Sequence, residues 1–128
     1  MAMREETEFW WEQAKRDLKI AEHNHANGDY EACAFFCEPA AQKALKALLM
    51  HRTDKPLPRI HNLVGLGRLV EADGKMSIFL GQLTPHYMIA RYPDAAGAVT
   101  TELNDGWMSR RFPLGTKEVL AWCRKHLR

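Results

Sequence analysis

The residues best suited to chemistry stand in the short run Ala90-Arg91-Tyr92-Pro93-Asp94, with Tyr87 one helical turn before the arginine. An arginine side chain presents a planar fork of N–H donors that matches phosphate oxygens. A tyrosine can stack on a nucleobase or donate a hydrogen bond to it. His61 adds an imidazole, which can move a proton near neutral pH, as cleavage at an RNA 2′-hydroxyl requires. These residue types together indicate a site that handles phosphate groups.

Two helices have to bring His61 to Arg91, because thirty positions separate them in the chain. Apolar residues recur at helical spacing over residues 59–72 and again over residues 76–91, and Asp73-Gly74 forms a tight turn between the two segments. Helices joined by a short turn pack antiparallel, so the start of the first lies beside the end of the second. We therefore expect His61, Tyr87, Arg91, Tyr92 and Asp94 to converge at one end of a helical bundle. A purely structural interpretation stays open, in which Asp94 pairs with Arg91 to hold the following loop and Tyr92 covers the core.

The remaining helices follow from the same periodicity. A first helix with an apolar stripe from Trp11 to His25 ends at Asn27-Gly28. Asp29 can cap a second helix over about residues 30–51, whose apolar surface is wide enough for a central position and in which Pro39 predicts a kink. Pro85 is expected to interrupt the helix over 76–91, and Pro93 to end it. Residues 93–113 read as a long connection, and a last helix is expected over about residues 116–127.

These elements predict a single all-α domain over residues 1–128, a four- to five-helix up-and-down bundle. A hydrophobic content of 46% is ordinary for a globular protein. The sequence has no stretch of about 20 apolar residues that would span a membrane, and its first residues do not resemble a secretory signal. Three cysteines do not suggest an extracellular disulfide framework, so we expect a cytoplasmic protein without a membrane partner.

The last part of the chain is basic. Residues 107–128 carry Arg110, Arg111, Lys117, Arg124, Lys125 and Arg128 against the single acid Glu118. Trp107 in the predicted connection stands near Arg110 and Arg111, and an aromatic ring beside arginines can support base stacking with phosphate contacts. A solvated helix face, with Trp107 folded onto the core, explains the same residues without a ligand.

Cysteine and histidine spacing does not indicate a metal site. Cys33 and Cys37 lie one turn apart, but no CxxC or histidine-rich pattern accompanies them, so buried thiols are the better interpretation, as for Cys123. His25 falls on the apolar stripe and is expected to pack against other residues rather than bind a ligand. We expect neither a metal nor another cofactor.

Three segments in order resemble the HEPN domain family. They are DYEACAFFCEPAAQKALKAL at residues 29–48, His61-Asn62-Leu63, and YMIARYPD at residues 87–94, and the resemblance covers essentially the whole chain. It implies a helical bundle that forms a homodimer and works with a minimal nucleotidyltransferase as a toxin–antitoxin pair. Many members are metal-independent ribonucleases with a composite site at the dimer interface, and their usual motif is an arginine followed four to six residues later by a histidine.

This sequence departs from that motif, because the positions after Arg91 hold Ala96, Gly97 and Ala98. His61 is the candidate replacement in space, whereas His86 precedes the arginine. Two hypotheses follow. In the first, the protein is a nucleotide- or RNA-binding module, and a ribonuclease-like toxin if His61 assists Arg91. In the second, it is a catalytically inert dimeric interaction domain.

Overall fold

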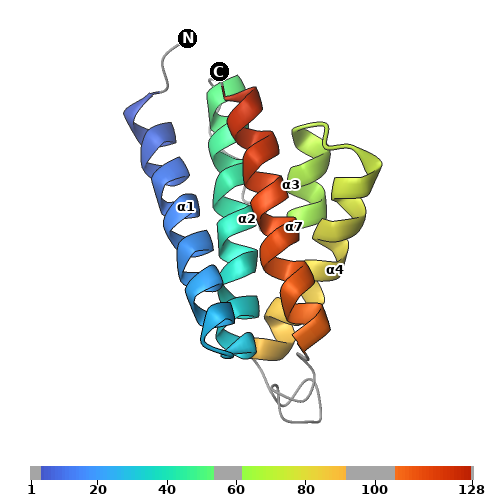
Figure 1. Ribbon diagram of the computed structural model, residues 1–128. Helices are drawn as coiled ribbons and strands as arrows, with labels where there is room; N and C mark the ends of the chain where they lie inside the picture. The colour runs from blue at the N-terminus through green and yellow to red at the C-terminus, as the bar shows by residue number, and fades with distance from the viewer. Residues whose placement is uncertain (1–3, 54–61, 92–105, 128) are drawn as a thin grey trace.

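The computed structural model describes residues 4–53, 62–91 and 106–127; for residues 85–91 and 106–109 it describes the backbone alone. The described part consists of the helices α1 (Glu5–Ala26), α2 (Tyr30–Arg52), α3 (Leu63–Leu69), α4 (Gly74–Arg91) and α7 (Gly106–His126), and short turns join α1 to α2 and α3 to α4 (Figure 1). The all-α bundle predicted from helical periodicity is therefore confirmed.

The turn between α1 and α2 forms as its residue types predict. Gly28 adopts a φ of 78°, which is the left-handed conformation that glycine tolerates best after a helix. The Asp29 side chain then accepts a hydrogen bond from the Ala32 amide at 3.3 Å and caps α2. The two long helices consequently run antiparallel and side by side (Figure 1).

Helix α2 is the central element of the bundle, because it packs against α1, α3, α4 and α7. It continues through Pro39 as a single helix. Small side chains on its buried faces let the neighbouring helices approach closely: Cys33, Ala34, Cys37, Ala40, Ala41, Ala44 and Ala47 are all fully buried.

Helix α3 is shorter than expected. Asn62 has an extended backbone, and its side chain accepts hydrogen bonds from the amides of Val64 at 2.9 Å and Gly65 at 3.2 Å. This is an N-cap, so the helix begins at Leu63 and not at Arg59. It ends before Glu71, whose φ of 61° is left-handed. The buried residues are those expected: Leu63, Leu66, Gly67 and Val70.

Two predictions about the last helices are wrong: the interruption at Pro85 and the start of the final helix at about residue 116. Helix α4 continues through Pro85 to Arg91, and α7 begins at Gly106, ten residues before the expected start, with Pro113 inside it. Phe112 is 1% exposed, so packing of this segment into the core outweighs the local preference against helix at the following proline. The long connection predicted over 93–113 therefore ends before residue 106. None of the described helices is long and apolar enough to cross a membrane.

Candidate functional site

The structure describes little of the predicted phosphate site. Arg91 is the last residue of α4 and Tyr87 lies one turn before it, but their side chains are outside the described part. His61, Tyr92 and Asp94 also lie outside the described residues. The convergence of these five side chains therefore stays a prediction.

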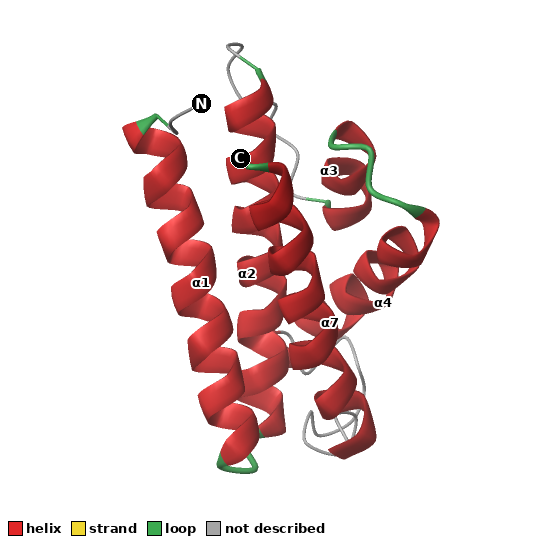
Figure 2. Cartoon of the chain, turned by 45° about the horizontal axis from the view of Figure 1, so that its top comes forward, coloured by secondary structure: helices red, strands yellow, loops and turns green. Residues whose placement is uncertain are grey.

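The pairing of α3 with α4 gives one relevant constraint (Figure 2). A Cβ at Gly81 would lie 3.7 Å from Cγ2 of Val64, so the first turn of α3 lies against the middle of α4. Arg91 is ten residues further along α4, or about 15 Å at 1.5 Å per residue.

The start of α7 lies at the same end of the bundle as the end of α4 (Figure 1). The sequence predicted that Arg110 and Arg111 lie in a loop. They lie instead on α7, at this end of the bundle. Arg111 donates two hydrogen bonds to Oε1 of Gln82 on α4, from Nε at 3.2 Å and from Nη2 at 3.1 Å. The paired bonds fix the plane of the guanidinium and leave its other N–H groups able to contact an anion.

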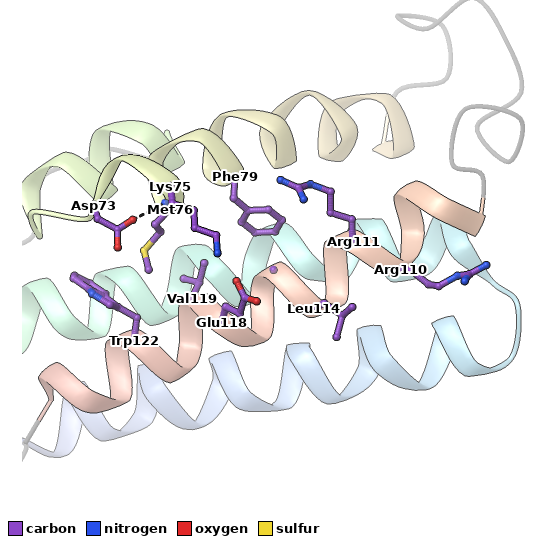
Figure 3. Close-up of a pocket in the computed structure, with 11 residues that line it drawn as sticks. Asp73, Lys75, Met76, Phe79, Arg110, Arg111, Leu114, Glu118, Val119 and Trp122 are labelled. Carbon is purple, nitrogen blue, oxygen red and sulfur yellow. Dashed lines mark hydrogen bonds between the residues drawn. The ribbon is translucent and has the colours of Figure 1, made fainter.

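A groove of about 690 Å³ runs from these arginines along the surface between α4 and α7 (Figure 3). Its volume is in the range of small-molecule binding sites. Both helices and the turn before α4 contribute to its lining: Asp73, Lys75, Met76, Phe79, Arg110, Arg111, Leu114, Gly115, Glu118, Val119 and Trp122.

Phe79 forms the apolar floor of this groove and joins its two walls. The ring is 7% exposed and packs directly on the backbone of Gly115 in α7. A Cβ at Gly115 would lie 2.7 Å from Cδ1 of the ring, closer than two carbons can approach. The absence of a side chain at Gly115 is therefore what allows Phe79 to lie between the helices.

The charged residues are distributed unevenly along the groove. Arg110 and Arg111 lie at the end near the start of α7, whereas Asp73 and Trp122 lie at the other end, with Lys75 and Glu118 between them (Figure 3). Oδ1 of Asp73 accepts a hydrogen bond from the Met76 amide at 2.8 Å and caps α4. The carboxylate is held in place by this cap and keeps a second oxygen able to accept.

Trp122 is positioned by His126 of the same helix and by Arg52 of α2. Its ring lies 4.4 Å from the His126 ring between centroids, and the guanidinium of Arg52 lies 6.0 Å from the Trp122 ring. Nη1 of Arg52 also donates to the carbonyl of Val70 at 2.7 Å, beside the strained residue Glu71. Arg52 of the central helix thus holds both Trp122 and the turn that carries Asp73.

Away from the groove, the perturbed groups are buried between helices. Burial raises the pKa of Glu38 to about 7, although nearby Lys46 and Lys43 oppose the shift. A hydrogen bond with Cys33, together with burial, raises the pKa of the Cys37 thiol, and burial raises that of Cys123 to about 12. The thiols are buried, as predicted from their positions on apolar faces. His25 is half-buried, and its ring lies 5.5 Å from the Tyr30 ring.

The HEPN domain family model matches residues 7–126. The chain belongs to the HEPN domain family. Among solved structures it is similar to TT1696 from Thermus thermophilus, with 23% identity and a TM-score of 0.85, covering 96% of this chain and 99% of that one. It is also similar to ST0689, an archaeal HEPN homologue, with 25% identity and a TM-score of 0.81 over the full length of both chains. No curated protein sequence matches the chain significantly.

Sequence reasoning missed the groove of this HEPN domain. It singled out Arg110 and Arg111, but it gave no role in a site to Lys75, Glu118 or Trp122 and expected Phe79 only as a buried residue of its helix. The available signal was the i, i+3, i+4 spacing of Arg111, Leu114, Gly115, Glu118, Val119 and Trp122, which places all of them on one face of a helix that starts before Pro113.

Proposed function

We propose that this HEPN domain binds RNA or nucleotides through the end of the bundle where α4 ends and α7 begins. The observation that carries the proposal is the placement of Arg110 and Arg111 at the end of the bundle that Arg91 also reaches. Arg110 and Arg111 are exposed, and Arg111 is oriented by Gln82, so these guanidiniums are available to phosphate oxygens.

Membership of the HEPN domain family supports the rest of the proposal, which concerns location, oligomeric state and partner. The protein acts in the cytoplasm as a homodimer and pairs with a minimal nucleotidyltransferase, as the ribonuclease-like half of a toxin–antitoxin system. Arg91 binds a phosphate, Tyr87, Tyr92 and Asp94 orient the RNA and the guanidinium, and no metal takes part. Because residues 96–98 contain no histidine, cleavage depends on His61 as the proton-transferring group.

A second candidate is an inert dimeric interaction domain, and a specific observation favours it. Leu114, which lines the groove, and Ile78 on α4 are large apolar side chains that are each 63% exposed, and a partner protein could cover them. In this account the protein is catalytically inert, and Arg91 only braces the connection that follows it.

The test measures both binding and cleavage of a structured RNA by the purified protein at several salt concentrations. The variants are Arg111→Ala, Arg91→Ala and His61→Ala. Arg124→Ala is the matched control, because Arg124 is also exposed on α7 but lies thirteen residues from Arg111, about 20 Å along the helix.

Loss of one phosphate contact lowers the slope of log affinity against log salt by about 1. We expect this change for Arg111→Ala and Arg91→Ala and no change for Arg124→Ala. His61→Ala should leave binding intact and abolish any cleavage. If the wild-type protein binds neither RNA nor nucleotides at low salt, the proposal is wrong and the interaction domain is the better account.

A further inference from the structure

The groove between α4 and α7 is open to solvent, yet the part beyond its two arginines is lined mostly by apolar side chains. Phe79 of α4 and Val119 of α7 are buried beneath it. Met76 and Trp122 are half-buried toward the end away from the arginines, and Leu114 of α7 is 63% exposed (Figure 3). Such a groove between two helices suits a protein partner, because apolar side chains of the partner can fill it.

The groove has the length of a short helix. Arg111 and Trp122 lie near its two ends and are eleven residues apart on α7, or about 16 Å at 1.5 Å per residue. A second helix lying along the groove covers this distance with about three turns. Its side chains at positions i, i+4 and i+7 then lie over the groove, with Phe79 beneath them.

The charged side chains of the groove differ between its two ends. Arg110 and Arg111 are exposed at one end, and two hydrogen bonds to Gln82 orient the guanidinium of Arg111. Asp73 lies at the other end, where one carboxylate oxygen accepts from the Met76 amide. Carboxylates match the donor fork of arginine, so a complementary helix carries acidic residues at the arginine end and a basic residue at the Asp73 end.

The same charges disfavour a nucleic acid along the whole groove. Asp73 at one end and Glu118 in the middle, beside Lys75, carry carboxylates that repel phosphate groups (Figure 3). An RNA backbone held at Arg110 and Arg111 therefore gains little from continuing along the groove. An amphipathic helix gains more, because it removes the apolar surface of the groove from water.

We propose that this groove is a docking surface for one amphipathic helix of a partner protein. The apolar side chains of that helix pack over Phe79 and against Leu114 and Trp122. Its acidic end binds Arg110 and Arg111. Tryptophan and arginine are the residue types that contribute most to affinity at protein interfaces. Docking of the helix does not depend on the proposed RNA binding, and the two share only the arginines.

The experiment selects binders to the purified protein from a phage-displayed library of random helical peptides of about 14 residues, a length that spans the groove. The affinity of an enriched peptide is then measured in solution by fluorescence anisotropy. We expect the enriched peptides to have apolar residues at i, i+4 and i+7 and acidic residues at one end. Enrichment of no peptide with this pattern would overturn the proposal.

Leu114→Gln tests the apolar contact, because this exposed side chain can change without disturbing the core. It should weaken binding of the enriched peptide about tenfold, the effect of losing one buried leucine side chain. Leu69→Gln is the matched control and should leave the affinity unchanged. Leu69 is also an exposed leucine, at 47%, but it lies on α3 and does not line the groove.

Arg111→Ala tests the charged contact. It should also weaken the peptide about tenfold, as expected for a hydrogen bond between charged groups. Replacing the acidic residues of the peptide by the corresponding amides should remove this effect, because the interaction with Arg111 is then already lost. If Arg111→Ala weakens the acidic and the amide peptide equally, the assigned position of the acidic end is wrong.

The outcomes separate the docking surface from the proposed function. Leu114→Gln should leave RNA binding unchanged, whereas Arg111→Ala weakens both RNA and peptide. If the enriched peptide binds Leu114→Gln as tightly as the wild type, the docking surface is wrong, whatever the RNA result. If no peptide is enriched and Leu114→Gln changes the mass measured by light scattering, a second copy of the chain covers the groove and the proposal is wrong. If the peptide binds as expected and RNA does not, the docking surface stands and the proposed function is wrong.

Discussion

Replacing Gly115 by alanine tests how α4 and α7 are held together. The new Cβ would lie 2.7 Å from Cδ1 of Phe79 and closer still to Cε1 and Cζ. The ring is buried and packs among other core residues, so moving it away from the new Cβ disturbs these contacts. Overpacking of this kind costs about 1–3 kcal/mol.

An opposing effect has to be subtracted from this cost. Alanine is better than glycine inside a helix by about 0.5–1 kcal/mol. The clash is the larger effect, so we expect Gly115→Ala to lower the free energy of unfolding by about 1–2 kcal/mol. In a domain of this size the melting temperature should fall by roughly 3–8 °C.

Urea denaturation followed by far-ultraviolet circular dichroism measures this difference. Gly81→Ala is the matched control, because its Cβ would meet only Cγ2 of Val64 at an ordinary 3.7 Å, and it should stabilise the protein by about 0.5–1 kcal/mol. Adding Phe79→Leu to Gly115→Ala should cost less than the sum of the single changes. Equal stabilisation by Gly115→Ala and Gly81→Ala would refute the packing of Phe79 on Gly115.

Three further predictions concern groups outside the groove. Glu38 binds its proton more tightly in the folded protein, with a pKa of about 7 against an ordinary 4.5. The free energy of unfolding should therefore fall as pH rises through this interval. Glu38→Gln should reduce this pH dependence in urea titrations from about pH 4 to pH 8. Asp17 accepts from Nζ of Lys43 at 2.6 Å, so Asp17→Ala should cost roughly 1–3 kcal/mol in the same assay, and a full-stability variant would show that the pair contributes nothing. The Cys123 thiol is buried, and its pKa is raised to about 12. It should therefore react with a thiol reagent such as dithionitrobenzoate only after the protein unfolds. Rapid reaction of the native protein, located at Cys123 by mass spectrometry, would contradict this prediction.

The parts of the fold that depend on residues close together in the chain could be predicted from the sequence. Asn27-Gly28 and the cap at Asp29 mark the first turn, and both act through short-range backbone geometry. The wide apolar surface of residues 30–51 predicted a central helix, which α2 is.

The start of α7 could not be predicted in the same way. Pro113 and Gly115 both favour a loop locally, and their helical conformation depends on contacts with distant residues. Phe112 is buried in the core, and Gly115 receives the ring of Phe79 from α4. Neither contact can be inferred from spacing along the chain.

The candidate site could likewise be predicted only in part from the sequence. Arg110 and Arg111 stood out because two adjacent arginines follow an aromatic residue, and these types suit phosphate on their own. Three other features depend on how α4 pairs with α7: the end of the bundle at which these arginines lie, the hydrogen bonds from Arg111 to Gln82, and the groove that extends to Trp122. Nothing in a single helix specifies that pairing.

The most direct test of the proposed function is the salt dependence of RNA binding by the wild-type protein and by Arg111→Ala. We predict binding at low salt whose slope against log salt falls by about 1 in Arg111→Ala and is unchanged in Arg124→Ala. Identical slopes for all three proteins, or no binding by the wild type, would contradict a phosphate-binding role for the end of the bundle where α4 and α7 meet.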